Sequence, residues 1–276
     1  MAWIARWRRW ALVAAAAALA CGDATEDEEV ALGRQAAREI EAQLPVLDDP
    51  VVTAYVDSLG QAIARRTARA DLAWRFAVVN TSVVNAFALP GGFIYVNRGL
   101  LERADRMSEL AGVLAHEVEH VVRRHSVEQM QKAQRTQTGV SLVCSLTNAC
   151  EGAGARIGIQ VAGSLLFARF GRDAEREADA GAFVNVRRAG VDPRGMRTFF
   201  EELAAEERAA GGDGGPVGAW FADHPGTADR IAEIERMLAA VPADELASYQ
   251  ANDAGFRIVR ARLASLPPAP PAPARP

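Results

Sequence analysis

The stretch HEVEH at residues 116–120 decides how the chain is interpreted, because its spacing is that of a metal-binding helix. Two histidines four residues apart project from one face of a helix, one turn from each other, and this separation suits zinc. Glu117 lies between them, within reach of a water molecule bound to the metal. The pattern predicts a hydrolytic zinc site, against the alternative of an ordinary solvated helix face.

The residues around this pentapeptide predict a helix over 107–124, with Ser108 as a plausible cap. Apolar residues recur at helical spacing, which places both histidines at the border of a core rather than on a fully wet face. These apolar residues are Leu110, Val113, Leu114, Val118, Val121 and Val122.

The chemistry expected of the site is peptide hydrolysis. Zinc lowers the pKa of a bound water toward about 7. A glutamate beside that water can accept its proton and return it to the departing amine. We therefore predict one Zn²⁺ per chain, held in part by His116 and His120, with Glu117 as the catalytic base.

The third zinc ligand separates the subclasses of such peptidases. One subclass, the metzincins, requires glycine at position 123 and histidine at position 126, where this chain has Arg123 and Ser126. The run RDAEREAD at residues 172–179 instead supplies Glu175, with Asp179 one turn later on the same helix face. Asp179 is predicted to hydrogen-bond the outer nitrogen of a ligating histidine. Alternatively, the run is only a solvated helix with ion pairs.

The rest of the chain predicts a mainly helical protein with a small sheet. The expected helices are 30–44, 51–66, 173–188, 193–208 and 227–240, with a mostly helical region over 126–170. The expected strands are Trp74–Asn80 and the run Phe93-Ile94-Tyr95-Val96 after a Leu-Pro-Gly-Gly turn. A glycine-rich loop at 211–218 is a candidate lid.

The N-terminus has the pattern of a secretory signal peptide over residues 1–20: a basic start, then an apolar run that is too short to span a membrane. The stretch ALAC at 18–21 resembles a lipoprotein cleavage box, although Ala18 stands where a larger aliphatic residue is usual. Lipidation of Cys21 is predicted, with ordinary secretion as the alternative. Residues 21–29 would then be an acidic tether, and Gly22 points weakly to the outer membrane.

The charge balance makes nucleic acid an unsuitable partner. Of 31 basic residues three lie in the leader, which leaves 28 against 35 acidic ones, a formal net charge of −7. Apart from Cys21, for which lipidation is predicted, the chain has Cys144 and Cys150, and such an even pair in an exported chain predicts a disulfide between them. Two unpaired thiols are the alternative.

In combination, HEVEH, EREAD (175–179) and the upstream NAFALPGGFIYVNRGLL (85–101) resemble the peptidase family that includes the CAAX prenyl proteases and the HtpX and BepA proteases. The resemblance covers roughly residues 30–240. It implies His116, His120 and Glu175 as zinc ligands, Glu117 as the base, and Asp179 as the aspartate behind a ligating histidine.

The same resemblance extends to a late His-Pro segment, His224-Pro225, which is followed by Arg230 at the family's spacing. Both side chains are expected to face the site, where they would stabilise the developing oxyanion. Alternatively, His224 occupies the open position on zinc in a resting state. The alternative for both is an ordinary surface role, and His125 is interpreted as structural.

The family resemblance also implies that the LPGGFIYVN segment is the active-site edge strand, which would hold an extended peptide through main-chain hydrogen bonds. The residues concerned are Gly91, Gly92, Phe93, Ile94 and Tyr95. The glycine pair would permit close approach of another backbone. Ordinary sheet core is the alternative.

Taken together, the sequence predicts an α+β, zincin-like fold, mainly α-helical, with a small sheet whose edge strand flanks the active-site helix. The peptidase domain is placed at 30–240, followed by a helical extension at 241–266 and a Pro/Ala tail at 267–276. By resemblance to exported relatives, the expected function is endoproteolysis of unfolded or misassembled envelope proteins in the periplasm. The alternative is a chaperone-like binding module whose zinc is blocked by His224.

Overall fold

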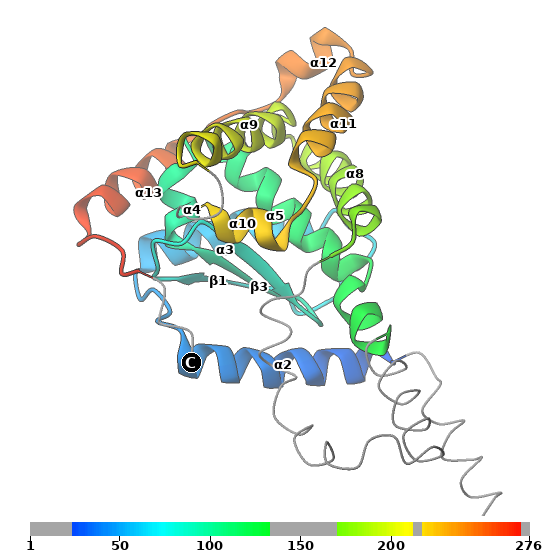
Figure 1. Ribbon diagram of the computed structural model, residues 1–276, viewed down its shortest axis with the longest axis vertical. Coiled ribbons are helices and arrows are strands. Elements are labelled where there is room, and N and C mark those ends of the chain that lie inside the picture. Colours follow the sequence, from blue (N-terminus) through cyan, green and yellow to red (C-terminus); the bar gives the residue numbers. More distant parts are fainter. Residues whose placement is uncertain (1–23, 133–169, 212–216, 272–276) are drawn as a thin grey trace, which may run out of the picture.

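A three-stranded sheet with helices on both faces forms the centre of the protein, as the computed structural model shows for residues 24–132, 170–211 and 217–271 (Figure 1). The described helices are α2 (Glu26–Gln43), α3 (Pro50–Ala64), α4 (Arg98–Arg103), α5 (Met107–Val122), α8 (Arg172–Arg188), α9 (Arg194–Ala209), α10 (Gly218–Asp223), α11 (Thr227–Ala239), α12 (Ala243–Ser248) and α13 (Ala254–Ser265). The strands are β1 (Arg75–Val79), β2 (Ala86–Leu89) and β3 (Phe93–Asn97). The predicted α+β fold, mainly helical, is confirmed.

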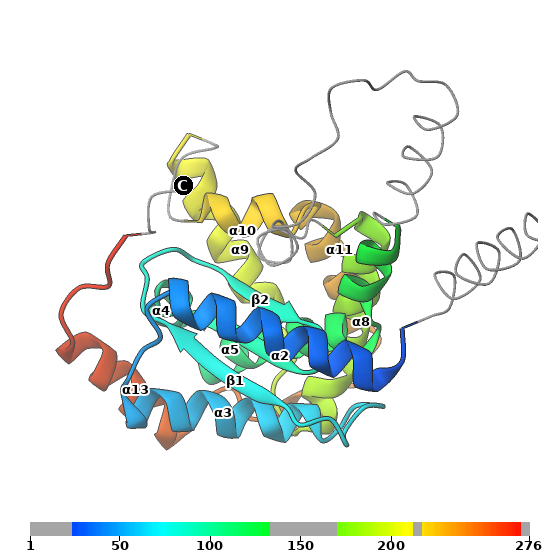
Figure 2. The same cartoon turned by 90° about the horizontal axis from the view of Figure 1, so that it is seen from below.

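Both faces of the sheet are buried, and alternate residues of each strand point to opposite faces. On one face, residues such as Ile94 and Val96 join the main core with α3 and α5. On the other face, Phe93 and Tyr95 pack against Ala36 and the rest of the apolar stripe of α2. Figure 2 shows α2 lying across this second face. The sheet is therefore a middle layer, and the layer on the α5 side carries the candidate site.

The strand order β1-β3-β2 corrects one prediction from the sequence. Phe93, Ile94 and Tyr95 lie in β3, which is the central strand, so they are not at the edge. β3 pairs in parallel with β1 and in antiparallel fashion with β2. The edge strand next to α5 is β2, the strand that precedes β3 in the hairpin. An edge strand therefore does flank the active-site helix, as expected, but it is β2.

The glycine pair in the turn between β2 and β3 serves the packing of α2. Gly91 and Gly92 have φ values of 76° and 97°, a region that favours glycine. A Cβ atom on Gly91 would lie 2.6 Å from the Cα of Val30 in α2. The close backbone approach expected at this pair is thus made by a helix of the same chain.

The first helix begins earlier than expected, at Glu26 rather than Val30. The Thr25 side chain accepts a hydrogen bond from the backbone N–H of Glu28, and the Glu28 carboxylate accepts one from the N–H of Thr25, which is a capping box. Residues 26–29, predicted as part of a tether, therefore form the first turn of α2.

Glu29, in this first turn, is buried and joins three separate segments. Its carboxylate pairs with Arg69 at 2.8 Å and with Arg124 at 2.8 Å, and it accepts the backbone N–H of Gly91 at 3.1 Å. Arg69 also donates to the carbonyl of Val121, near the end of α5. We call this set of contacts the Glu29 clamp. It fastens the start of α2 to the end of the helix that carries HEVEH.

The start of α5 also differs from the prediction. The helix begins at Met107, and Ser108 is buried in its first turn instead of capping it. The capping role falls to Glu109, whose Oε2 accepts the backbone N–H groups of Asp105 at 2.7 Å and Arg106 at 3.2 Å. A carboxylate at this position also interacts favourably with the helix dipole.

The C-terminal extension belongs to the main core. Phe256, Val259 and Leu263 of α13 are buried with the residues of α3 and α5. Residues 267–271 have no regular structure, but the Pro270 carbonyl accepts the backbone N–H of Ser82.

Several predictions concern residues outside the described part of the chain. These are the leader with Cys21, the pair Cys144 and Cys150, most of the region 126–170, most of the candidate lid at 211–218, and the end of the tail. Within the described ranges, residues 125–132 are helical, and none of the helices has the length and apolar character needed to cross a membrane.

The Glu29 clamp makes a prediction about stability. Replacing Glu29 by Gln leaves Arg124 without a charged partner and leaves Arg69 with only the exposed Glu26, and we expect a loss of about 3 kcal/mol in the free energy of unfolding. Urea denaturation followed by circular dichroism measures it. Asp27→Asn, an exposed change in the same helical turn, is the matched control and should cost less than about 1 kcal/mol. Equal, small losses in both variants would contradict a role for the clamp.

Candidate metal centre

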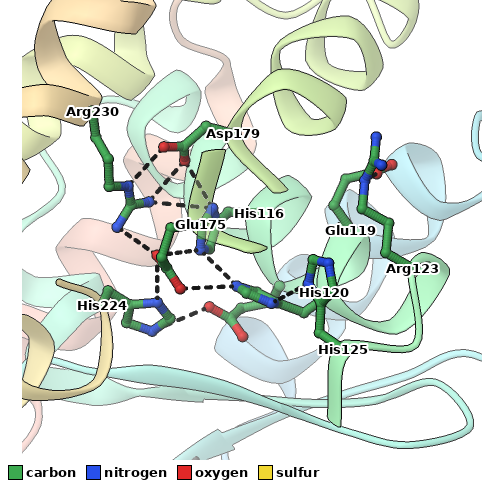
Figure 3. Close-up of polar contacts among 10 residues, drawn as sticks. His116, Glu119, His120, Arg123, His125, Glu175, Asp179, His224 and Arg230 are labelled. Carbon is green, nitrogen blue, oxygen red and sulfur yellow. Dashed lines mark hydrogen bonds and ion pairs between the residues drawn. The ribbon is translucent and has the colours of Figure 1, made fainter. Parts of the chain in front are cut away.

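The predicted site residues come from four helices that meet beside the sheet (Figure 3). Helix α5 passes close to α8 along much of its length, and α11 packs against α8. Helix α5 supplies His116, Glu117 and His120, α8 supplies Glu175 and Asp179, His224 follows α10, and Arg230 belongs to α11. All seven side chains are buried. The structure thus brings together residues that lie more than 100 positions apart.

Four of these side chains form the candidate ligand group: His116, His120, Glu175 and His224. One nitrogen or oxygen atom from each lies within 4.8 Å of the others, and among the described residues this is the group that could hold a metal ion. The Nε2 atoms of His116 and His120 are 2.9 Å apart. The Glu175 carboxylate lies 3.4 Å from the first of these nitrogens and 3.5 Å from the second.

The arrangement of donor atoms fits a metal ion, because several buried oxygen atoms at the site have no hydrogen-bond partner among the described residues. Both carboxylate oxygens of Glu117 and Oε1 of Glu175 are buried without a hydrogen-bond partner in the described part of the chain. Unsatisfied carboxylate oxygens are costly in a protein interior. Two imidazole nitrogens and a carboxylate are also the protein ligands of many catalytic zinc sites. A cation in this position would satisfy the group.

Asp179 and Arg230 support the ligand group from behind. Asp179 Oδ1 lies 2.9 Å from Nδ1 of His116, which leaves Nε2 of that ring directed at the other ligands. Arg230 donates to both oxygens of Asp179 at 2.7 Å and pairs with Glu175 at 2.8 Å. Its guanidinium also stacks over the ring of Phe200. One arginine therefore orients two carboxylates that come from the same helix.

The electrostatics follow from this arrangement. Burial alone would raise the pKa of Asp179, but Arg230 and the bond to His116 hold it at about 2. For Glu175, the imidazoles of His224 and His116 likewise outweigh burial and keep its pKa far below the usual range. Burial and Arg230 would lower the pKa of His116, but Glu175 and Asp179 raise it to about 9. Both carboxylates are therefore ionised at neutral pH.

Glu117 stands apart from these paired groups. Burial raises its pKa, against the lowering effect of His224 and His116. His224 Nε2 is 3.6 Å from one of its oxygens, beyond hydrogen-bond distance. A buried carboxylate with a raised pKa and free oxygens is the state expected of a general base.

His224 reaches the site from the end of α10 and lies between two carboxylates. Its Nδ1 is 3.3 Å from Glu175, and its ring lies against that of Trp220, with 4.4 Å between centroids. The neighbouring Asp223 accepts a hydrogen bond from Asn85, just before β2. The segment that carries His224 is thus fastened to the start of the edge strand.

Close packing of α5 against α8 is maintained by a second, separate polar contact. Glu119 is buried, accepts from Asn185 at 2.6 Å and pairs with Arg123. A Cβ atom on Gly181 would meet the Glu119 carboxylate at 2.1 Å, so a larger residue there would displace the Glu119 side chain from its present position. The spacing between the two helices, on which the ligand geometry depends, is therefore set by residues that do not touch the ligand group.

His125, which the sequence suggested to be structural, contacts a candidate ligand directly. Its Nδ1 lies 2.9 Å from Nδ1 of His120, and Phe170 stacks on the His120 ring with 4.0 Å between centroids. Burial lowers the pKa of both histidines. In the sequence, the only sign of this contact is a third histidine five residues after the motif. Helical spacing alone would not bring its side chain back to His120.

Comparisons with known proteins place the site in context. A model of peptidase family M48 matches residues 50–238. The chain is 32% identical over 188 residues to a beta-barrel assembly-enhancing protease of Yersinia pestis, covering 66% of this chain and 39% of that protein. It is 31% identical over 245 residues to a putative protease of the same name from Vibrio cholerae, covering 87% and 49%.

A mitochondrial metalloendopeptidase of Schizosaccharomyces pombe is 32% identical over 186 residues, which cover 67% of this chain and 53% of that protein. The chain therefore matches between 39% and 53% of the length of these curated relatives. All seven predicted site residues lie inside the range that the family model matches.

Arg230 offers a direct test of the buried charge network. In Arg230→Gln, the carboxylates of Asp179 and Glu175 remain buried without their cation, so the metal-free protein should lose about 3–5 kcal/mol of unfolding free energy. Chemical denaturation in the presence of a chelator measures the loss. Arg236→Gln, an exposed change on the same helix, should alter stability by less than about 0.5 kcal/mol. A loss below about 1 kcal/mol for Arg230→Gln would contradict the account.

Proposed function

The chain belongs to peptidase family M48, and from this premise we propose that it is a zinc-dependent endopeptidase of unfolded or misassembled envelope proteins. One observation carries the proposal: four candidate ligands lie within 4.8 Å of one another beside Glu117, whose buried oxygens are unbonded within the described residues. His116, His120 and Glu175 hold the ion in this proposal. When bound, zinc polarises the scissile carbonyl and acidifies a water molecule.

Glu117 is the proton carrier of the reaction. It accepts a proton from the attacking water and later returns it to the amine that leaves. Its raised pKa favours the first step, because a more basic carboxylate takes up the proton readily. Its burial beside the ligand group supports this role.

Arg230 contributes positioning and positive charge. It orients Glu175 and Asp179, and through Asp179 it fixes the proton on Nδ1 of His116. Its guanidinium contacts side chains of the ligand group without belonging to that group. It therefore stabilises negative charge that develops at the site and does not displace a ligand.

In this proposal the peptide is held by β2, along the edge that does not pair with β3. The backbone N–H of Asn97 donates to the carbonyl of Asn85, so residues 85, 87 and 89 carry the hydrogen-bonded pairs with β3. The backbone groups of Ala86 and Ala88 therefore face away from β3, and of these the N–H of Ala86 donates to the Asn85 side chain at 3.0 Å, a bond that an added peptide would have to replace. An extended peptide can add to such an edge through main-chain bonds, which gives little sequence selectivity. That property suits an enzyme acting on unfolded chains.

The substrate class and location rest on similarity and on the leader. The relatives from Yersinia pestis and Vibrio cholerae are named for the assembly of beta-barrels. A signal peptide over residues 1–20 and lipidation of Cys21 would place the enzyme in the periplasm, anchored to the outer membrane. The domain limits at 241 and 267 and a Cys144–Cys150 disulfide remain part of the proposal, and the start of the peptidase domain moves from residue 30 to the beginning of α2.

Glu117→Gln tests the proposed base. The amide keeps the shape of the side chain but cannot accept a proton, so cleavage of unfolded casein should fall by 10²–10⁴-fold. Zinc content, measured by elemental analysis, should stay at about one ion per chain in both proteins, since His116, His120 and Glu175 are unchanged. The absence of zinc from the parent protein would refute the proposed function.

The position of His224 favours a second candidate, a latent enzyme or chaperone-like module with a blocked zinc site. Its ring belongs to the candidate ligand group and lies between Glu117 and Glu175. In such a resting state His224 occupies the position that water or substrate needs. The intact Glu117 supports an enzyme that opens, rather than a permanently inactive binding protein.

His224→Ala separates the two candidates. If His224 blocks the site at rest, casein cleavage should rise several-fold in the variant while zinc content stays at one ion per chain. If His224 instead stabilises the oxyanion, kcat should fall by about 10²-fold. Steady-state kinetics with a quenched-fluorescence peptide measure the difference, and Asn85→Ala, which loosens the same segment without removing the ring, is the control.

A further inference from the structure

His120 uses both ring nitrogens in the folded protein. Its Nε2 faces Glu175 and His116 in the candidate ligand group, and its Nδ1 is 2.9 Å from Nδ1 of His125. The other ring nitrogen of His125, Nε2, points to the carboxylate of Glu177 at 3.6 Å. The groups therefore line up in the order Glu177, His125, His120.

The direction of the bond between the two histidines follows from metal ligation. A neutral imidazole carries one ring proton and binds a metal through the other nitrogen. When Nε2 of His120 is the ligand atom, Nδ1 carries the proton and donates it to Nδ1 of His125. His125 must then carry its own proton on Nε2, the nitrogen that faces Glu177. The reverse direction would place a proton on the ligand atom of His120.

On this basis we propose that His125 is a positioning residue that holds His120 in its metal-binding tautomer and ring orientation. The inference rests on the proposed metal function. His116 has the equivalent support from a carboxylate, because Asp179 accepts its Nδ1 proton at 2.9 Å. The two ligating histidines are thus supported differently, one by a charged acceptor and one by a neutral ring.

The backbone around His125 is shaped for this contact. Helix α5 ends at Val122, and Arg124 has a φ of 58°, in the left-handed region that non-glycine residues rarely adopt. This turn brings residue 125 back toward His120 instead of continuing along the helix. Such a conformation is energetically unfavourable for a residue with a side chain, and the ion pair of Arg124 with buried Glu29 helps to offset this cost.

The packing leaves His120 little freedom to rotate. Phe170 stacks on its ring on one side, and the same phenyl ring lies 5.9 Å from the ring of His125. His125 itself is 7% exposed, so water does not readily replace it as the acceptor. Removing its nitrogen therefore leaves the Nδ1–H of His120 unpaired when the metal is bound, which weakens that state.

The experiment measures zinc affinity, by competition of the metal-free protein with a fluorescent chelator, for three variants. His125→Leu removes the acceptor, and we expect its dissociation constant for zinc to rise 10–100-fold. His125→Asn places a side-chain carbonyl near the position of Nδ1 and should stay within about threefold of the parent. Glu128→Gln, an exposed change one turn later, should leave the affinity unchanged.

Unfolding of each metal-free variant in urea shows whether it is folded before zinc is added. A rise confined to His125→Leu, with rescue by His125→Asn, supports the inference. Unchanged affinity in His125→Leu, or equal losses in the Leu and Asn variants, overturns it in favour of simple packing. A parent protein that binds no zinc refutes the proposed function itself, which is a different result.

Discussion

The constraint on which the structure depends is the burial of carboxylates at the junction of α5 and α8. An isolated buried carboxylate costs several kcal/mol, so each one needs a cation or hydrogen-bond donors. Arg230 forms ion pairs with Glu175 and Asp179, and these pairs hold α11 against α8. Among the described residues, the Glu117 oxygens have no hydrogen-bond partner, and the nearest ion-pair contact is His224 at 3.6 Å. A metal ion bound beside Glu117 would bring positive charge to this point of the site.

Those parts of the structure that depend on local periodicity were predictable from the sequence. A helical period of 3.6 places His116 and His120 on one face. In β3 alternate side chains point to opposite faces, so its continuous apolar run predicts burial on both sides. The same helical argument placed Glu175 and Asp179 one turn apart on one helix. In the folded protein these four side chains indeed converge, because each helix presents its polar face to the other.

What depended on long-range pairing was not predictable from the sequence alone. The strand FIYVN reads equally well as an edge or a central strand, and only the parallel pairing with β1 makes it central. The contact of His125 with His120 requires the left-handed backbone at Arg124, for which the sequence carries no marker. The early start of α2 is different, since Thr25 and Glu28 form a capping box that the sequence itself contains, within a run of acidic residues.

The Glu29 clamp sets the lower limit for trimming the chain. A recombinant domain cut at Val30, the boundary that the sequence suggested, would lose the carboxylate that Arg69 and Arg124 share. It would also lose the capping box and expose the backbone N–H of Gly91. The smallest unit that retains the whole clamp starts at Ala24, whose carbonyl accepts a hydrogen bond from Arg124. The part of the chain that the clamp holds together thus begins three residues after Cys21, the residue at which cleavage and lipidation are proposed.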